Sequence, residues 1–424
     1  MSQKVVVTGL GAITPLGRDV PTTWKNAITG VSGIVRLDDK WVEQYELPVR
    51  IAGKVAVDPL ETGRLTKVEA KRQDPSGRLA LVAAREAWED AGFSGTDAES
   101  SDEVDPERTA VAFGTGIGGV WTLLDAWDTL REKGPRRVLP MTVPMLMPNT
   151  CAAAISMSLK ARASAQTVVS ACASSTEALD VALDLIRDGK ADVVVCGGAE
   201  SAIHPMPLAA FAKMQALSTR NDDPQAASRP YDVGRDGFVM SEGAAALVLE
   251  SEQHALARGA RIYAELAGAG VSADSYHITS PDPEALGATR ALQEALEDGK
   301  VDPTQVVHVN AHATSTPVGD IPEAQALHHA FGEHTKNIAV SATKSMTGHL
   351  LGGAGALEAL FTVKALHERL APCTINLDEQ DPQIDLDVVT QARPLPEGEI
   401  VALTNSFGFG GHNAVAAFRS YSQK

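Results

Sequence analysis

The strongest constraint on the fold is an alternation of strand-like and helix-like segments along the whole chain of 424 residues. Short runs rich in β-branched residues, such as KVVVTG, TVVSAC and IVALTNSF, are separated by segments such as GRLALVAAREAWEDAG. In the latter, apolar residues recur at helical spacing. Alternation of this kind is typical of βαβ units, in which helices cover both faces of a sheet. The sequence therefore predicts an α/β fold with mainly parallel sheets.

Two parts of the chain repeat short motifs in the same order. EAWED, VDP and VSAC begin at residues 86, 104 and 169, and EALED, VDP and VSAT begin at residues 294, 301 and 340. The alternative is chance similarity between segments rich in Ala, Glu and Val. We expect two related α/β halves, residues 1–255 and 256–424, that meet in the charged stretch LESEQHALARGARI.

Charge and cysteine content exclude several classes of protein. A formal net charge of −17 argues against nucleic acid and anionic membranes as partners. Cys151, Cys172, Cys196 and Cys373 form no CxxC pair, which indicates reduced thiols rather than a zinc site or a disulfide framework. No apolar run approaches the roughly 20 residues that span a bilayer, and the N-terminus does not read as a signal peptide. We expect a cytoplasmic protein without membrane insertion.

Cys172 lies where the strand-like run TVVS gives way to a helical pattern. At a helix start, unpaired backbone N–H groups and the positive end of the helix dipole favour a thiolate. Small neighbouring residues leave room for a substrate. The alternative is an ordinary buried cysteine, a common core residue. The position makes Cys172 a candidate nucleophile.

Three further segments carry groups that could serve this thiol. VNAHATSTPVGD contains His312, and SATKSMTGH contains Lys344 and His349, each after a predicted strand, where α/β folds bind ligands. TNSFGFGGHN alternates glycines with Phe407 and Phe409, so its backbone could offer N–H donors to an oxyanion beside an aromatic gate. A tight turn is the alternative. FGTGIGG matches G-x-G-x-x-G, but a helical segment follows it, so no nicotinamide site is expected.

Taken together, these segments resemble those of the β-ketoacyl-[acyl carrier protein] synthases, most closely the elongating type II enzymes of fatty-acid synthesis and their actinobacterial mycolate-pathway relatives. The motifs that carry the resemblance are SACAS, STRNDDPQAASRPYDVGRDGFVMSEGA, VNAHATSTPVGD, TKSMTGH and NSFGFGGHN. The resemblance implies the thiolase fold, two related α/β halves in five layers (αβαβα), and a homodimer. It also implies decarboxylative Claisen condensation of an acyl-enzyme with malonyl-[acyl carrier protein]. No metal or redox cofactor is required, and the carrier supplies phosphopantetheine.

The resemblance also assigns roles to matched positions. Cys172 corresponds to the nucleophile, and His312 and His349 to the pair that assists decarboxylation and carbon–carbon bond formation. Lys344 corresponds to the lysine that organises this pair. The other matches are Phe409 for the gate and, with Cys172, the oxyanion hole; Thr314 and Thr316 for the pantetheine arm; Ile117 and Phe211 for the acyl pocket; and Glu358 and Asp320 for a structural polar network, which in the family sometimes holds a monovalent cation.

Carrier proteins of this class are acidic, so an acidic enzyme needs a local basic rim. We expect this rim at Lys67, Lys71, Arg72, Arg136 and Arg137. Solvated surface charge is the alternative explanation for these residues. One departure from the family pattern concerns Ala313, which stands where many members have glycine.

Three rival functions share parts of this pattern. A thiolase uses a Cys/His/Cys set, but neither Cys196 nor Cys373 lies in a matching C-terminal motif. A non-catalytic chain-length factor lacks the nucleophile, which this chain has at Cys172. A polyketide synthase subunit with the same chemistry stays open, as does the preferred acyl chain.

Overall fold

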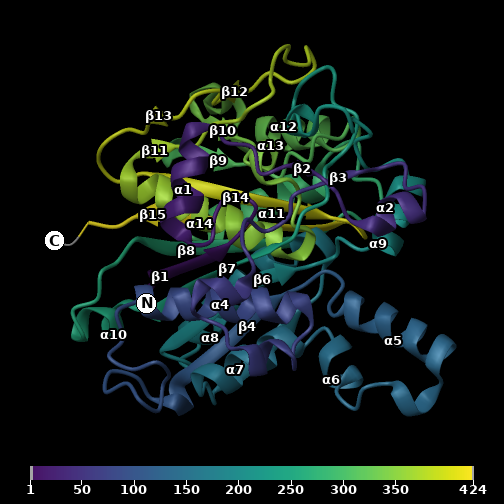
Figure 1. Ribbon diagram of the computed structural model, residues 1–424. Coiled ribbons are helices and arrows are strands. Elements are labelled where there is room, and N and C mark those ends of the chain that lie inside the picture. The colour runs from purple at the N-terminus through teal and green to yellow at the C-terminus, as the bar shows by residue number, and fades with distance from the viewer. Residues whose placement is uncertain (1–2, 423–424) are drawn as a thin grey trace.

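Eleven strands form one sheet in the order β12-β10-β9-β14-β15-β8-β1-β7-β6-β4-β5 in the computed structural model, which describes residues 3–422 (Figure 1). The strands of the first half are β1 (Val5–Ile13), β4 (Thr109–Gly114), β5 (Ser164–Val168), β6 (Val193–Glu200) and β7 (Gly243–Ser251). Those of the second half are β8 (Ala264–Ala273), β9 (Val306–Asn310), β10 (Ala339–Ser341), β12 (Asp387–Val388), β14 (Val401–Gly408) and β15 (His412–Ser420).

The two ends of this sheet have the same strand arrangement. In the first half, β4 pairs in parallel with β5 and β6, and β7 is antiparallel to β6 and β1. In the second half, β9 pairs in parallel with β10 and β14, and β15 is antiparallel to β14 and β8. The expectation of mainly parallel sheets is therefore wrong. One cause is the short turn between β14 and β15, because a short turn forces antiparallel pairing.

The two halves are joined along their innermost strands. β1 pairs antiparallel with β8 through Val5 and Leu266, Val6 and Glu265, and Val7 and Ala264. This short ladder makes one continuous sheet out of two similar parts. The sequence predicted neither β8 nor β15, because AELAGAGVSA and HNAVAAFRS are rich in alanine and poor in the β-branched residues that mark strands.

Helices complete five layers around the two halves. α8 (Ser174–Arg187) and α14 (Ala354–Glu368) touch each other and strands of both halves, so they form the central layer. α4 (Pro75–Asp90) and α7 (Thr150–Leu159) pack on the outer face of the first half, and α11 (Leu286–Asp298) and α12 (Asp320–Phe331) belong to the outer layer of the second. This is the αβαβα order that the family resemblance implied.

Shorter elements connect these layers. The remaining helices are α1 (Val20–Thr29), α2 (Lys40–Gln44), α3 (Lys67–Ala70), α5 (Val120–Lys133), α6 (Thr142–Leu146), α9 (Pro205–Lys213), α10 (Glu252–Ala257) and α13 (Lys344–Thr347). Two further strand pairs are β2 (Val35–Arg36) with β3 (Ile51–Ala52) and β11 (Leu370–Ala371) with β13 (Arg393–Pro394). Within residues 3–422, no helix has the length and apolar character needed to cross a bilayer.

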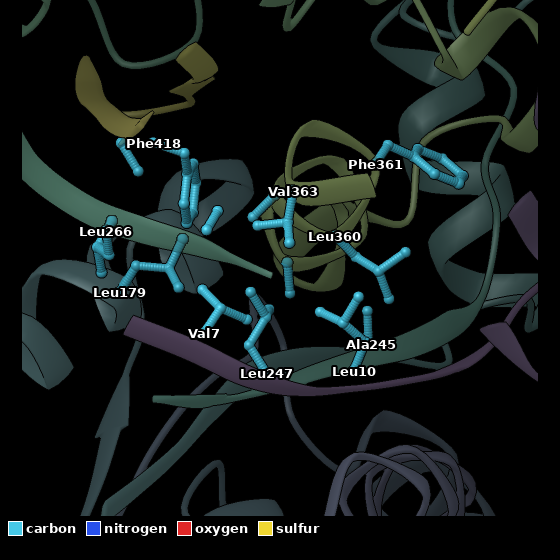
Figure 2. Close-up of a cluster of buried hydrophobic side chains, with 14 of the residues drawn as sticks. Val7, Leu10, Leu179, Ala245, Leu247, Leu266, Leu360, Phe361, Val363 and Phe418 are labelled. Atoms are coloured by element: carbon cyan, nitrogen blue, oxygen red, sulfur yellow. The ribbon is translucent and has the colours of Figure 1, made fainter. Parts of the chain in front are cut away.

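The largest core lies between the two halves of the sheet. Figure 2 shows Val7, Leu247 and Leu266 from the strands facing Leu360 and Val363 of α14. α14 is buried around nearly its whole circumference, as its Ala-, Leu- and Gly-rich sequence predicts for an interior helix. Full burial of each Leu or Val side chain stabilises the fold by about 1.5–3 kcal/mol.

Close helix–strand contacts repeat in the two halves. A Cβ atom on Gly11 of β1 would lie 2.0 Å from the Ala83 carbonyl oxygen of α4, and one on Gly270 of β8 would lie 2.2 Å from the Ala291 carbonyl oxygen of α11. The repeated motifs EAWED and EALED end these same two helices. The repeat seen in the sequence thus corresponds to a repeated packing arrangement.

Candidate active site

Cys172 lies on a tight turn between β5 and α8. Residues Ala171–Ala173 form one 3₁₀ turn, and α8 begins only at Ser174, so the thiol precedes the α-helix instead of lying in its first turn. Ala171 has a left-handed backbone with φ of +51°. The Ser174 hydroxyl fixes this turn, because it donates to the Ala171 carbonyl at 2.6 Å and accepts from the Ser170 N–H at 2.9 Å.

The turn presents the half-buried thiol to a cavity of about 460 Å³. Segments far apart in the sequence meet there, and they include most of the predicted site. The predicted residues that line the cavity are Cys172, His312, His349, Thr314, Thr316, Ile117, Phe211 and Phe409. Lys344, Glu358 and Asp320 lie behind its wall and are fully or almost fully buried.

The two histidines converge on the sulfur. The Nε2 atom of His349 lies 3.1 Å from the Cys172 Sγ atom. The His312 and His349 rings are edge to face, with centroids 5.4 Å apart. One ring nitrogen from each histidine and the sulfur all lie within 4.8 Å of one another. One bound thioester could therefore contact all three groups.

Hydrogen bonds fix the tautomer of each imidazole. The Nδ1 atom of His349 accepts from the Leu351 N–H at 3.3 Å. The Nδ1 atom of His312 lies 3.3 Å from the Lys344 ammonium, which also donates to the His312 carbonyl at 2.6 Å. An ammonium and a backbone N–H can only donate, so the Nδ1 atom must accept in both rings. Each histidine therefore carries its proton on Nε2.

This proton placement favours hydrogen bonding over metal binding. Cys172, His312 and His349 form a sulfur–nitrogen donor set of the kind that binds zinc. A metal at that position would need the lone pairs of both Nε2 atoms. Those atoms hold hydrogens, because Leu351 and Lys344 occupy the Nδ1 lone pairs. The set is therefore better suited to donate two hydrogen bonds to a substrate oxygen.

Burial controls the charges in the site. Burial, reinforced by the Lys344 charge, lowers the pKa of His312 and of His349 well below 6.5, so both rings are neutral. Burial raises the pKa of the Cys172 thiol from 9.0 to about 11, although the Lys344 charge and the Phe409 N–H oppose this shift. The raised pKa favours a neutral thiol at rest, opposite to the thiolate expected from the helix start. One 3₁₀ turn ahead of α8 does not compensate for desolvation.

Backbone N–H groups beside the sulfur form a candidate oxyanion hole. The Phe409 N–H donates to the Cys172 sulfur. Gly408 allows this approach, because a Cβ atom there would lie 2.9 Å from the Ser170 carbonyl and 3.1 Å from the Cys172 nitrogen. The Phe409 ring leans toward Phe211, with centroids 6.4 Å apart. The predicted gate residue thus lies between the thiol and the predicted acyl pocket.

A buried lysine–glutamate pair supports the histidines from behind. Lys344 pairs with Glu358, and both side chains are almost completely buried. A second carboxylate, Glu323 of α12, accepts from the His312 N–H at 2.8 Å and from the Ala313 N–H at 2.6 Å. Ala313 needs this support because its φ is +24°. Glu323 was not predicted from the sequence, although an acidic residue on a buried helix face was a usable signal.

The glycine-rich segment FGTGIGG binds an internal carboxylate. Glu200 at the end of β6 is fully buried and accepts from the N–H groups of Gly116 at 2.7 Å, Ile117 at 3.3 Å and Gly352 at 3.1 Å. Its own carboxylate thus occupies the N–H groups that a dinucleotide phosphate would need. The helix predicted after this segment is α5. Glu200 was not predicted from the sequence.

The candidate docking residues lie outside the cavity. Lys67 belongs to α3, Lys71 and Arg72 follow it, and Arg136 and Arg137 lie on the turn after α5. All five are exposed. Within residues 3–422, none of the five takes part in a salt bridge. These are properties of a basic surface that could receive an acidic partner.

Family models match both halves of the chain. A model described as the N-terminal domain of beta-ketoacyl synthase matches residues 2–255. A second model, described as the C-terminal domain of beta-ketoacyl synthase, matches residues 263–378. The first of these models alone covers more than half of the chain.

Relatives and solved structures match almost the full length. The 3-oxoacyl-[acyl-carrier-protein] synthase 2 of Staphylococcus aureus is 44% identical over 421 residues, 99% of each chain. The protein of that name from Synechocystis sp. is 45% identical over 99% of this chain and 98% of its own. A beta-ketoacyl synthase structure from Burkholderia phymatum matches with a TM-score of 0.89 at 35% identity, over 99% of this chain and 100% of its own.

A further structure contains a partner. It is the AntDE:AntF complex, a type II polyketide synthase acyl-carrier protein with its ketosynthase, and it matches over 100% of both chains with a TM-score of 0.90 at 31% identity. These matches agree with the site, in which a thiol and two imidazole donors share one cavity. Sequence, fold and geometry lead to the same assignment: the chain belongs to the β-ketoacyl synthase family.

Proposed function

We propose that Cys172 accepts the acyl chain and that His312 and His349 promote its elongation. The chain is an acyltransferase that condenses an acyl thioester with malonyl-[acyl carrier protein], releases CO₂ and forms a 3-oxoacyl-[acyl carrier protein] two carbons longer. One observation carries the assignment of residues: two neutral imidazoles direct Nε2–H donors at the space beside the Cys172 sulfur.

The first half-reaction moves the acyl chain onto the enzyme. The Cys172 sulfur attacks the thioester carbonyl, and the N–H groups of Cys172 and Phe409 stabilise the resulting oxyanion. The carbon–sulfur bond to pantetheine then breaks. The thiol proton that Cys172 loses neutralises the departing pantetheine thiolate. Because the resting group is a thiol, this step needs no stored charge in the apolar cavity.

The second half-reaction forms the carbon–carbon bond. The malonyl thioester oxygen accepts hydrogen bonds from His312 and His349 while the carboxylate leaves as CO₂. The electron pair of the broken bond becomes an enolate, and each positioned donor stabilises its oxygen by about 3–4 kcal/mol. The enolate carbon attacks the acyl-Cys172 carbonyl, the oxyanion collapses, and the Cys172 thiolate departs and takes a proton from water.

Two accessory groups follow from the same assignment. The carrier protein supplies phosphopantetheine, for which Thr314 and Thr316 line the cavity. Buried oxygens of Glu358 and Asn405 have no hydrogen-bond partner, and such oxygen donors fit a hard monovalent cation. Glu358 and Asn405 would hold this ion. It would supply positive charge to the polar network behind the histidines.

The surface of the chain supports a homodimer. Leu123, Trp127 and Leu130 form an exposed apolar stripe on α5, which projects from the body of the molecule (Figure 1). β5 is an edge strand with partly exposed side chains. Unpartnered apolar stripes and open edges are common at subunit interfaces. Sedimentation of the full chain at twice its monomer mass is the expected result, and a monomer at micromolar concentration would contradict it.

Compartment and domain boundary complete the proposal. The four cysteines are free, with three of them buried, which suits the reducing cytoplasm. We also infer that the halves divide at residues 255 and 256, within α10 and close to the end of the first matched family model.

The substrate is a fatty acyl chain in this proposal. The identity of 44% to 3-oxoacyl-[acyl-carrier-protein] synthase 2, against 31% to the polyketide ketosynthase, supports that choice.

CO₂ release from malonyl-[acyl carrier protein] tests the roles of the two histidines. Removing either Nε2–H donor by His312→Ala or His349→Ala should slow CO₂ release by roughly 100-fold or more. Alkylation of Cys172 by iodoacetamide should persist in both variants, because the thiol remains accessible. His328→Ala on the outer helix α12 is the matched control and should release CO₂ at the same rate as the unchanged protein. CO₂ release within threefold of the unchanged protein in both site variants would refute the assignment.

A further inference from the structure

We propose that Arg235 is a positioning residue for the pantetheine arm. It lies outside the cavity and holds the turn that carries Thr314 and Thr316. The inference rests on the proposed function, in which these two threonines contact pantetheine. It gives a role to the long motif STRNDDPQAASRPYDVGRDGFVMSEGA, which the catalytic groups do not explain.

The turn needs external support because its backbone is strained. Ala313 and Ser315 have φ angles of +24° and +66°, in the left-handed region that disfavours side chains. The Thr314 and Thr316 hydroxyls lie 3.0 Å apart, so they present one joint polar surface to the cavity. Bonds from outside the turn must maintain that arrangement.

Glu323 holds the Ala313 N–H at the start of the turn, and the neighbouring segment of residues 229–237 supplies the bonds to Ser315 and Thr316. The Arg229 N–H donates to the Ser315 hydroxyl at 2.9 Å, and the Gly237 N–H donates to the Ser315 carbonyl at 3.0 Å. Arg235 adds the one side-chain contact, a bond of 3.3 Å from its Nε atom to the Thr316 carbonyl. The Thr316 carbonyl also accepts from the Gly319 and Asp320 N–H groups at 3.3 and 3.4 Å, and Arg235 adds its bond from the 229–237 segment.

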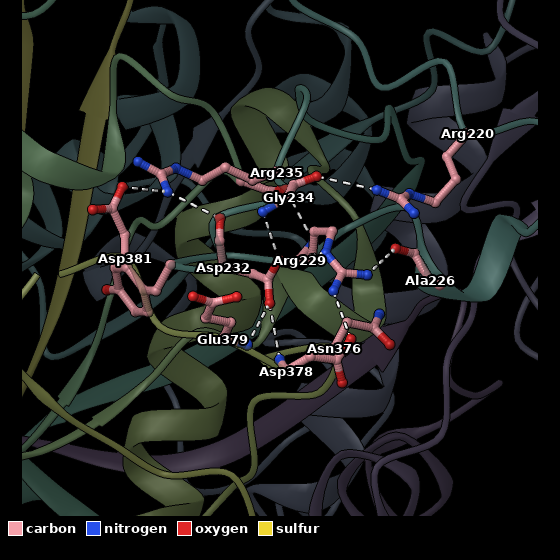
Figure 3. A network of polar contacts seen from close by, with 12 residues as sticks. Arg220, Ala226, Arg229, Asp232, Gly234, Arg235, Asn376, Asp378, Glu379 and Asp381 are labelled. Carbon is pink, nitrogen blue, oxygen red and sulfur yellow. Dashed lines mark hydrogen bonds and ion pairs between the residues drawn. The ribbon is translucent and has the colours of Figure 1, made fainter.

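Arg235 is itself held from two further directions. Its Nη1 atom donates to the Asp232 carbonyl at 2.9 Å and pairs with Asp381 at 2.9 Å, as Figure 3 shows. Its Nε atom also lies 3.7 Å from the fully buried Asp320. Only a planar guanidinium can reach these partners together, because a lysine would offer one point charge. The side chain is 4% exposed, so it cannot move without breaking these contacts.

The supporting segment is anchored to the second half of the chain. Asp232 accepts from the N–H groups of Asp378 at 2.9 Å and Glu379 at 3.0 Å, and it pairs with Arg229 at 2.9 Å (Figure 3). Arg229 also pairs with Asp378 at 2.7 Å. This network makes residues 229–237 a rigid base from which Arg235 fixes the threonine turn.

Two acyl donors distinguish positioning from general stability. One is an acyl thioester of pantetheine, and the other is the S-ethyl thioester of the same acid, which lacks every pantetheine amide. Acylation of Cys172 is followed by mass spectrometry in Arg235→Met, Arg235→Lys and the matched control Arg419→Met. Arg419 is also a largely buried, ion-paired arginine, at 3.1 Å from Glu265, but it lies on β15.

We expect Arg235→Met to raise KM for the pantetheine donor about tenfold, equivalent to about 1.4 kcal/mol, with kcat changed less than threefold. Arg235→Lys should show a smaller rise in KM for the pantetheine donor. Arg419→Met should leave this KM unchanged. The S-ethyl donor should show a change below about twofold in all variants. Equal losses with both donors, or no loss with either, would overturn the positioning role. Failure of the unchanged protein to acylate Cys172 would instead overturn the proposed function.

Discussion

The Cys172 thiol is subject to two opposing influences. The Lys344 charge and the Phe409 N–H stabilise a thiolate, whereas desolvation in the apolar cavity stabilises the neutral thiol and is the larger effect. The neutral histidines add no positive charge, because burial lowers their pKa values well below 6.5. Burial therefore favours the protonated form of the nucleophile.

The pH dependence of alkylation should reflect this thiol. Only a thiolate reacts with iodoacetamide, and the pKa of Cys172 is raised to about 11. The rate at Cys172 should therefore increase about tenfold per pH unit from pH 7 to beyond pH 9. Peptide mass spectrometry separates Cys172 from the buried Cys151 and Cys196, which serve as internal controls. A plateau below pH 9 would mean that the helix end, and not desolvation, controls the thiol.

The sequence could predict the reacting groups but not their supports. Cys172, His312 and His349 were recognisable because small residues and glycines surround them after strand-like runs. Glu323 and Glu200 were not, because their role depends on backbone N–H groups that the folded turns direct at them, 10 to 11 residues away for Glu323 and 84 for Glu200. The shift in the pKa of Cys172 is also opposite in direction to the one expected from a helix start. The sequence indicated a helix start nearby, but the depth of the cavity depends on the whole fold.

At the scale of elements, glycine sets the distance between the outer helices and the sheet. Gly270 of β8 and Gly11 of β1 lie directly under helix carbonyls in the two halves. β8, which is rich in alanine and glycine, has weak intrinsic β-propensity, unlike the Val-rich β1. The close packing of α11 on β8 favours the strand there. The same feature hid β8 from sequence analysis.

Gly270→Ala should destabilise the protein by about 1–3 kcal/mol, because its Cβ atom would lie 2.2 Å from the Ala291 carbonyl and α11 must move away. Gly11→Ala should have a similar cost, since its contact with α4 is equivalent. Gly299→Ala is the control, because its Cβ atom would meet no neighbour closer than 3.1 Å. Urea unfolding measures all three. Midpoints for Gly270→Ala and Gly299→Ala that coincide would argue against close packing as the determinant.

At the scale of the whole molecule, the duplication creates the site. The nucleophile follows β5 in the first half, and Lys344 follows the equivalent strand β10 in the second. The repeated motifs allowed this relationship to be predicted. The β1–β8 ladder that joins the halves could not be predicted, because it depends on only a few residue pairs of unremarkable composition.

The net charge of −17 makes recognition of an acidic carrier a local matter. At 0.1 M salt, acidic groups more than a Debye length of about 10 Å from the carrier are screened. Only charged groups close to the docked carrier then affect its binding. Lys71 and Arg72 are exposed and adjacent, and no salt bridge within residues 3–422 neutralises either of them. They should therefore contribute to docking mainly through the rate of association.

Reversal of both charges by Lys71→Glu and Arg72→Glu should raise KM for the carrier substrate roughly 5- to 10-fold at low salt, with kcat little changed. The effect should shrink as salt rises from 20 mM to 300 mM, because screening weakens attraction and repulsion alike. Lys336→Glu is the control: Lys336 is exposed but already pairs with Glu333 at 3.1 Å. Acyl-pantetheine, which lacks the carrier, should be turned over equally by all variants. A KM that is unchanged at every salt concentration would assign these residues to solvated surface instead of carrier recognition.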